Sequence, residues 1–393
     1  MKRILNLLKN HYPKECQRIA KFLSTKYVKN INLNLCNSTQ KRVLISYLCI
    51  NNTNFSEVHH AAFLHINQII FYFIRKGYCI DICQNDDINS FIELKSHKYD
   101  IILGFGKVYK LFCEAQSIPI RINFITENNP EIVKLRYNER LLYFKERHTK
   151  ISIKDAYPRI GYFDKEQFTI SNYGIVMNSN YNMASFKSYI KNIYRINCNA
   201  IFNEKYKFNV SEISKQIIKS RNNFLWFGSV GIIHKGLDIL IDTFKYFPNL
   251  NLNCYGIDNR ELNLFSRIKG INTYNCGKIN VLSDEFYNEI ILKHNFIIFP
   301  SCSEGMSTAV ATCMAHGIIP IITKETGFES CNCIIELESY HIECIKQTIA
   351  NINLMSDEQI LQLRKECYNY ARKNFSLDNF DTSFSIILDN ILS

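Results

Sequence analysis

One segment of the sequence, Pro300-Ser301-Cys302-Ser303-Glu304-Gly305-Met306-Ser307-Thr308, combines residue types that could bind an anion and a polyol together. It follows an apolar run that predicts a strand and precedes a run that predicts a helix. Its amides therefore lie at a helix N-terminus, where unpaired N–H groups and the helix dipole favour anions. Gly305 would let a ligand approach the backbone closely. The Glu304 carboxylate would repel the same anion and instead suits hydroxyl groups, through hydrogen bonds worth roughly 1.5–3 kcal/mol each. This combination indicates a sugar phosphate; the alternative is an ordinary helix start with a capping Ser and a first-turn Glu.

A second segment, Phe227-Gly228-Ser229-Val230-Gly231-Ile232-Ile233-His234-Lys235-Gly236-Leu237-Asp238, also leads from a predicted strand through glycines to a predicted helix. Lys235 stands just before that helix, and a phosphate there would receive a point charge and backbone donors together. The spacing differs from that of the Walker P-loop, and no Ser or Thr follows the lysine. The alternative is a surface lysine in a turn.

The elements that would position these loops alternate between strand and helix, which predicts α/β architecture with parallel sheets covered on both faces. We expect a basic helical extension over residues 1–40, a Rossmann-like domain over 41–210 and a second Rossmann-like domain over 211–375. A final helix over 376–393 could pack back on the first domain. Two such domains imply a cleft between them, where ligands bind in these folds.

Taken together, the two segments resemble family 4 (group 1) glycosyltransferases, which have the GT-B fold of two Rossmann-like domains. The residues that carry the resemblance are Trp226-Phe227-Gly228-Ser229, His234-Lys235-Gly236-Leu237-Asp238, Phe299-Pro300-Ser301-Cys302-Ser303-Glu304-Gly305 and Cys313-Met314-Ala315-His316-Gly317-Ile318-Ile319-Pro320-Ile321. The first domain is similar mainly in its rhythm of strands and helices and in Tyr99-Asp100-Ile101-Ile102-Leu103-Gly104-Phe105-Gly106.

The resemblance implies a role for each matching position. Lys235 would bind the diphosphate of a nucleotide-sugar donor and stabilise charge on the leaving group, and Glu304 would hold hydroxyls of the donor sugar. The remaining donor-binding candidates are Gly228, Ser229, Ser303, Gly305, Met306, Ser307 and Thr312. Such enzymes usually retain the anomeric configuration and need neither a metal nor another cofactor. The chain departs from the family at two of these positions: Thr312 stands where a second Glu usually grips the ribose, and Ser229 where many members have an Arg.

The first domain should supply the acceptor site. His59, His60 and His65 cluster near the start of a predicted helix, with Glu57 just before them. His60 could face the cleft, or His60, His65 and Glu57 could bind a metal; the alternative, which we favour, is packing or surface histidines. The loop Thr126-Glu127-Asn128-Asn129-Pro130 follows a strand where many relatives have a His, and here Asn129 is a candidate for the cleft side.

Composition and charge limit the remaining function classes. The 393 residues are 47% hydrophobic and 13% aromatic, which excludes a disordered chain. No apolar run reaches the ~18 residues of a membrane span, and the N-terminal residues lack the pattern of a secretory signal. Residues 1–42 contain ten of the 47 basic residues and a single acid, whereas the rest of the chain is almost neutral. That basic segment could lie against an anionic membrane or bind nucleic acid; it has few aromatic residues for stacking, so we expect no nucleic-acid partner.

These observations predict a glycosyltransferase, with retention of configuration, that moves a sugar from a nucleotide-sugar donor to a glycan or lipid-linked acceptor in cell-surface polysaccharide synthesis. The expected location is the cytoplasm, with peripheral contact at the inner face of the membrane as a further hypothesis. The alternative is a GT-B subunit that binds nucleotide and has lost turnover, because Thr312 and Ser229 replace charged residues.

Overall fold

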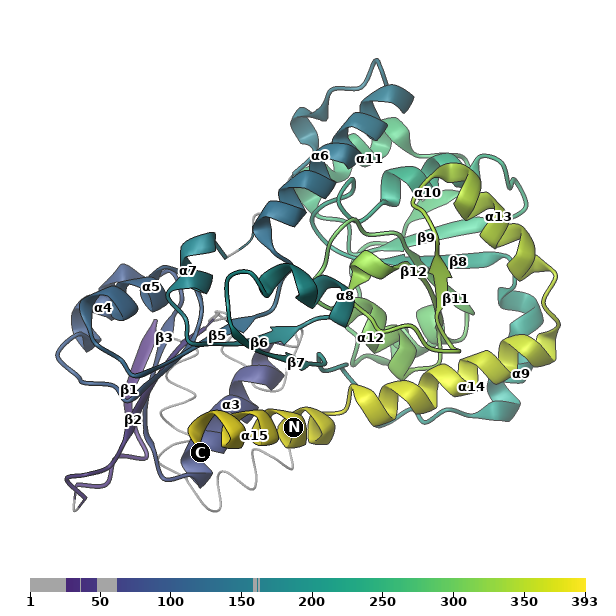
Figure 1. Ribbon diagram of the computed structural model, residues 1–393. Helices are drawn as coiled ribbons and strands as arrows, with labels where there is room; N and C mark the ends of the chain where they lie inside the picture. Colours follow the sequence, from purple (N-terminus) through teal and green to yellow (C-terminus); the bar gives the residue numbers. More distant parts are fainter. Residues whose placement is uncertain (1–25, 36, 48–61, 158–160, 162) are drawn as a thin grey trace.

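The computed structural model describes residues 26–393, except residues 36, 48–61, 158–160 and 162. Its helices and strands form two α/β domains, each built around a mainly parallel sheet (Figure 1). The predicted two-domain α/β architecture is therefore confirmed.

The first sheet has the strand order β1-β3-β2-β4-β5-β6-β7. Its strands are β1 (Tyr27–Ile31), β2 (Arg42–Tyr47), β3 (Cys79–Gln84), β4 (Ile101–Gly104), β5 (Ile120–Ile125), β6 (Tyr173–Met177) and β7 (Asn192–Ile196). β1 is antiparallel to β3, and the other neighbours are parallel. One face packs on α3 (Ala62–Arg75) and α15 (Leu377–Leu392), and the other on α4 (Ile88–Leu94), α5 (Gly106–Ala115) and α7 (Lys165–Thr169). Because both faces are covered, β2, β3 and β4 are almost continuously apolar and buried.

The second sheet is entirely parallel, in the order β10-β9-β8-β11-β12-β13. Its strands are β8 (Asn223–Phe227), β9 (Asn251–Tyr255), β10 (Thr273–Asn275), β11 (Phe296–Phe299), β12 (Ile319–Thr323) and β13 (Ile335–Leu337). One group of helices comprises α10 (Leu237–Phe244), α11 (Leu262–Ile268) and α13 (Ile342–Asn353), and another comprises α9 (Val210–Ser220), α12 (Thr308–Ala315) and α14 (Asp357–Asn374). The strand order reverses between β8 and β11, the place where open parallel sheets bind ligands.

Short helical turns complete the two domains. They are α8 (Asn180–Met183), η1 (Ile153–Asp155), η2 (Ala184–Phe186), η3 (Asn259–Glu261), η4 (Phe286–Ile291) and η5 (Lys324–Thr326).

The predicted helical extension over residues 1–40 is wrong in the part that the structure describes. Residues 27–31 form the edge strand β1, with Val28 and Ile31 buried against the sheet. Residues 1–25 lie outside the described residues.

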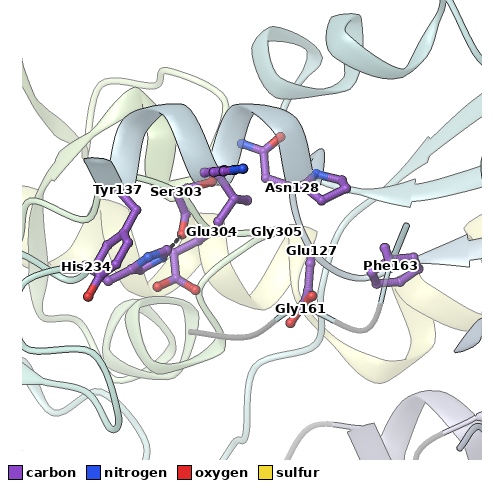
Figure 2. A pocket seen from close by; sticks show the side chains of 12 residues that line it. Glu127, Asn128, Tyr137, Gly161, Phe163, His234, Ser303, Glu304 and Gly305 are labelled. Atoms are coloured by element: carbon purple, nitrogen blue, oxygen red, sulfur yellow. Dashed lines mark hydrogen bonds between the residues drawn. The ribbon is translucent and has the colours of Figure 1, made fainter. Parts of the chain in front are cut away.

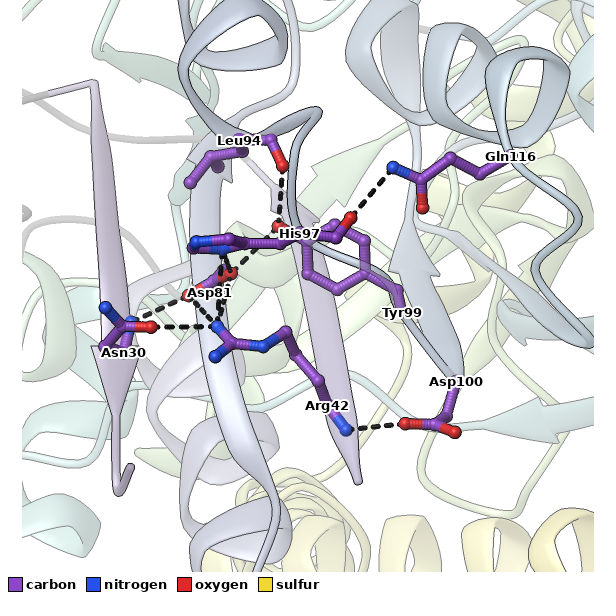
Figure 3. Close-up of polar contacts among 8 residues, drawn as sticks. All are labelled: Asn30, Arg42, Asp81, Leu94, His97, Tyr99, Asp100 and Gln116. Carbon is purple, nitrogen blue, oxygen red and sulfur yellow. Dashed lines mark hydrogen bonds and ion pairs between the residues drawn. The ribbon is translucent and has the colours of Figure 1, made fainter. Parts of the chain in front are cut away.

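A buried carboxylate explains why β1 is a strand (Figure 3). Asp81 of β3 has no exposed surface and accepts hydrogen bonds from the Asn30 amide at 2.7 Å, from the Arg42 guanidinium at 2.9 Å and from the Tyr99 hydroxyl at 2.8 Å. His97 Nδ1 lies 2.6 Å from the same carboxylate. A buried charge must be paired in this way, and the bond from Asn30, which has a φ of 61° at an irregularity in the pairing of β1, attaches this edge strand to β3.

The helix α6 (Pro130–Arg147) belongs to the first domain by sequence, yet it extends over the second domain (Figure 1). Arg140 is almost completely buried there and donates a hydrogen bond to the Pro300 carbonyl at 2.7 Å. Arg147 forms ion pairs with Asp238 and Asp242 of α10. The two domains are therefore joined by a helix as well as by the linker.

The chain crosses between the domains twice. The first crossing contains Ala200 and the second Phe375, and the Ala200 amide donates to the Phe375 carbonyl at 2.9 Å. After the second crossing, α15 lies along α3, where the Tyr72 hydroxyl donates to Asp389 at 2.6 Å and Arg75 pairs with Asp381 at 2.9 Å. The C-terminal helix thus packs on the first domain.

Candidate functional site

The two loops singled out in the sequence follow β8 and β11 and lie together at the reversal of strand order. The Cys302 amide donates to the His234 carbonyl at 2.9 Å, and the Ser301 hydroxyl donates to the same oxygen at 3.3 Å. Gly236, with a positive φ of 70°, packs so closely on Pro300 that an added Cβ would lie 2.6 Å from its carbonyl oxygen. The loops therefore form one rigid unit at the carboxyl edge of the sheet.

Lys235 is largely buried in this unit, with 7% of its surface exposed. Its Nζ donates to Ser229 Oγ at 3.0 Å and lies 5.9 Å from the centre of the Phe299 ring. Ser229, which stands where the resemblance leads us to expect an arginine, thus contacts the lysine directly. Gly228 is fixed by its own amide, which donates to the Tyr255 carbonyl at 3.1 Å.

The loop amides near Lys235 are already bound by a side chain that the sequence did not reveal. Glu261, at the end of η3, accepts from the Gly231 amide at 2.6 Å and from the Ile232 amide at 3.0 Å. The sequence predicts that backbone donors of this loop serve a phosphate. In the structure the Glu261 carboxylate binds these amides in place of a phosphate. The loop therefore offers an anion the positive charge of Lys235.

Glu304 lies at the domain interface with 6% of its surface exposed. Its Oε1 accepts from the Ser301 hydroxyl at 3.2 Å. Its backbone is held from both sides, because its amide donates to the Glu325 carbonyl at 3.0 Å and its carbonyl accepts from Asn178 Nδ2 at 3.2 Å. The Glu304 side chain is therefore fixed in place at the domain interface.

Gly305 lies close to the backbone of the first domain, whereas the sequence suggested that a ligand would approach it. An added Cβ would lie 2.1 Å from the Thr126 carbonyl oxygen. On its other side, an added Cβ on Gly327, where φ is 94°, would lie 1.8 Å from the Gly305 carbonyl oxygen. Both glycines are needed because three backbone segments meet here without room for side chains.

A cavity of about 220 Å³ lies between the domains beside this contact (Figure 2). The second domain contributes His234, Ser303, Glu304 and Gly305, and the first domain contributes Glu127, Asn128, Pro130, Val133, Lys134, Tyr137, Gly161 and Phe163. Figure 2 shows the carboxylates of Glu127 and Glu304 on two sides of it.

Two polar groups in the cavity wall indicate that it takes a hydrogen-bonding ligand. Ser303 Oγ and Asn128 Nδ2 belong to buried residues and have no hydrogen-bond partner among the residues that the structure describes. A buried group left in this state costs roughly 1–3 kcal/mol. A ligand with hydroxyl groups could satisfy both groups and the Glu304 carboxylate at once.

The remaining candidates lie in α12 or just before it, and each forms a hydrogen bond with a backbone amide. Ser307 caps the helix, because its hydroxyl accepts from the Val310 amide at 3.5 Å. Met306 Sδ accepts from the Cys198 amide at 3.3 Å, and Thr312 Oγ1 accepts from the Ile201 amide at 3.1 Å. The resemblance assigned the ribose to position 312; in this structure the Thr312 hydroxyl binds the interdomain linker.

The first-domain candidates are placed differently from one another. Glu57, His59 and His60 lie outside the described residues. His65 is buried, accepts from the Asn199 amide at 3.3 Å and stacks on Phe380. Asn129 caps α6 and donates to the Ser185 carbonyl at 2.9 Å, so its neighbours Glu127 and Asn128 line the cavity instead.

Within the part of the chain that the structure describes, no three His, Cys, Asp or Glu side chains are placed to hold a metal ion. A metal-independent reaction stays a prediction.

Several cavity residues could not be predicted from the sequence. The resemblance directs attention in the loop over 126–130 to a histidine that this chain lacks, and it gives no indication of Glu127 and Asn128, which line the cavity. Phe163 and Tyr137 carry no signal in the sequence, because they reach the cavity only through the path of α6 and the packing of the two domains.

Comparison with known proteins supports the fold. No protein-family model and no curated protein sequence matches the chain. Among solved structures, HepE from Anabaena in complex with UDP and glucose aligns with a TM-score of 0.58 at 12% identity, over 89% of this chain and 100% of that one. Sucrose-phosphate synthase from Thermosynechococcus elongatus aligns with a TM-score of 0.60 at 13% identity, over 90% and 99%. WaaG, a glycosyltransferase involved in lipopolysaccharide biosynthesis, aligns with a TM-score of 0.53 at 14% identity, over 88% and 99%.

These structures share the GT-B architecture, and the chain therefore has the GT-B fold, with two Rossmann-like domains facing each other. At 12–14% identity the similarity shows the fold, and an argument about activity must come from the site.

Two buried histidines predict how stability depends on pH. Burial lowers the pKa of His316 and of His294 to about 4. Unfolded histidines have a pKa near 6.5, so between pH 4 and pH 6.5 the unfolded chain binds more protons. The free energy of unfolding should therefore fall as the pH drops through this window, by more than about 1 kcal/mol per pH unit for each histidine.

Urea titrations at several pH values, followed by the fluorescence of the single tryptophan Trp226 in β8, would measure this slope. A variant with His294→Gln and His316→Gln should lose this part of the slope. A slope that the double variant leaves unchanged would contradict the assignment.

Proposed function

We propose that the chain is a glycosyltransferase that takes a sugar from a nucleotide-diphosphate donor. The observation that carries this proposal is the interdomain cavity, in which Glu304, Ser303 Oγ and Asn128 Nδ2 offer hydrogen bonds to hydroxyl groups. It lies beside the loop of Lys235 in a GT-B fold, and the similar HepE structure contains UDP and glucose. The cavity suits a single sugar ring, and Lys235 suits the diphosphate attached to it.

The negative and the positive side chain of the site would have different roles. The Glu304 carboxylate would accept hydrogen bonds from hydroxyls of the donor sugar and keep the ring in place. When the bond between the anomeric carbon and the diphosphate breaks, negative charge grows on the leaving oxygen. Lys235 Nζ would stabilise that charge, together with the amides of Gly305 and Met306 in the loop just before α12. The lysine and the helix N-terminus would do this without a metal, and we propose retention of the anomeric configuration.

The acceptor in this proposal is a glycan or a lipid-linked sugar used in cell-surface polysaccharide synthesis. Support comes from the first-domain wall of the cavity, which can present a second sugar to the donor, and from similarity to WaaG. The rival proposal is a GT-B subunit that binds nucleotide without turnover. The tests below separate the two.

Lys235→Ala should weaken binding of UDP, or of whichever nucleoside diphosphate binds best, by about 10- to 100-fold. A hydrogen bond to a charged group contributes roughly 1.5–3 kcal/mol, which corresponds to this range. Glu304→Gln should keep nucleotide binding and lower donor turnover by a similar factor. Calorimetry and a donor-hydrolysis assay measure the two effects.

The matched control is Lys293→Ala, which removes a surface lysine of the same domain that pairs with Glu289 at 2.6 Å. It should match the wild type in both assays. Absence of nucleotide binding by the wild type would refute the proposal, and binding without hydrolysis or transfer would favour the subunit without turnover.

We also propose a cytoplasmic location with peripheral contact between the basic N-terminal segment and an anionic membrane. In the described part of this segment, Arg42 binds Asp81 at 2.9 Å and Lys26 lies 3.3 Å from Asp87. Six of its ten basic residues precede residue 26 in the sequence, and these are the charges that we assign to the membrane. No helix among the described residues is long and apolar enough to cross a bilayer.

Full-length protein should float with vesicles that contain anionic lipid, because each basic residue near such a surface contributes about 1 kcal/mol. Replacement of six basic residues by Gln should abolish flotation without disturbing β1: Lys2, Arg3, Lys9, Lys14, Arg18 and Lys21. Equal flotation of the two proteins would reject the membrane role. Neutral vesicles are the control.

A further inference from the structure

Glu261 is a buried carboxylate that binds backbone amides of two separate segments of the chain. It has no exposed surface, and its carboxylate accepts from three backbone amides: Gly231 at 2.6 Å, Ile232 at 3.0 Å and Tyr157 at 3.3 Å. Two of these amides belong to the loop between β8 and α10. The third belongs to the segment that follows α6, so one carboxylate connects the donor-side loop to the chain of the first domain.

The bonded loop residues are the ones that determine where Lys235 lies. The Lys235 amide donates to the Gly231 carbonyl at 2.8 Å, and the Leu237 amide donates to the Ile232 carbonyl at 2.9 Å. Gly231 has a φ of 102°, which glycine adopts without strain. Glu261 therefore holds the two residues on which the backbone of Lys235 and the start of α10 rest.

Burial and hydrogen bonding shift the pKa of the Glu261 carboxyl in opposite directions. Burial raises the pKa of Glu261 above its usual value, and the hydrogen bonds from the three amides offset part of that shift. Charge-assisted hydrogen bonds from N–H groups are the arrangement that keeps a buried carboxylate ionised. The loop thus contains its own anion, in a place where a phosphate could otherwise bind to the same amides.

We propose that Glu261 is a positioning residue for Lys235: it occupies the amides of the glycine loop and so leaves the donor diphosphate to Lys235 Nζ and the N-terminus of α12. This inference rests on the proposed glycosyltransferase function. It adds a residue to the donor site that neither the sequence motif nor the cavity contains.

A double-mutant cycle tests the proposal in the full-length protein. Calorimetry with UDP, or with the nucleoside diphosphate that binds the wild type best, gives the Kd of the wild type, Glu261→Gln, Lys235→Ala and the double variant. Gln keeps the size of the side chain, removes the charge and turns an amide group toward backbone donors. We expect Glu261→Gln to weaken binding about 10-fold in the wild-type background and less than 2-fold in the Lys235→Ala background, because residues that act as a unit are not additive.

The control is Glu289→Gln, which removes an acidic residue of the same domain at the surface and should leave Kd unchanged in both backgrounds. The melting temperature of each ligand-free variant is measured in parallel. If Glu261→Gln does not fold, Glu261→Asp keeps the charge on a shorter side chain. It should then weaken binding measurably in the wild-type background only.

An equal loss of affinity in the two backgrounds, or a lowered melting temperature with unchanged Kd, would overturn the positioning role. Absence of nucleotide binding by the wild type would instead refute the proposed function. The two failures are therefore distinguishable.

Discussion

The arrangement of the site depends on one backbone contact between the domains. Gly305 lies against the carbonyl of Thr126, and Gly327 lies against the carbonyl of Gly305. Both contacts are so close that neither position has room for a Cβ atom. This contact sets Ser303 and Glu304 of one domain opposite Glu127 and Asn128 of the other. Because the cavity takes its walls from both domains, it exists only while they meet in this way.

The interdomain linker is held by residues in α12 and directly beside it. The amides of Cys198, Ile201 and Asn203 donate to Met306 Sδ, Thr312 Oγ1 and His316 Nε2, and the Asn199 amide donates to His65 of the first domain. His316 must be neutral to accept this bond, since its Nδ1 lies 2.8 Å from the Thr312 carbonyl and donates to it. The segment from Ser303 to His316 therefore lines the cavity at its start and holds the linker along its length, so that domain orientation and site geometry depend on the same stretch of chain.

The sequence predicted those parts of the site that come from one contiguous segment of chain. The loops of Lys235 and Glu304 each join a strand to a helix, and both lie where the sequence placed them, in the predicted fold. The far wall of the cavity could not be predicted, because Asn128 and Phe163 reach it only through the relative orientation of two domains. The motif predicts a ribose contact for Thr312, whereas its partner in the structure is a linker amide. The edge strand β1 could not be predicted, because the buried Asp81 that binds its backbone lies 51 residues away from Asn30.

The central claim is that contact between Gly305 and Thr126 assembles a sugar site across the two domains. The most direct measurement compares turnover of the nucleotide-sugar donor with nucleotide affinity in Gly305→Ala. The added methyl would lie 2.1 Å from the Thr126 carbonyl oxygen and would force the domains apart. A displacement of this order can cost about 100-fold in rate, so turnover should fall by about that factor, and nucleotide affinity should fall less, because Lys235 keeps its place in the second domain. Turnover at the wild-type level would contradict the account.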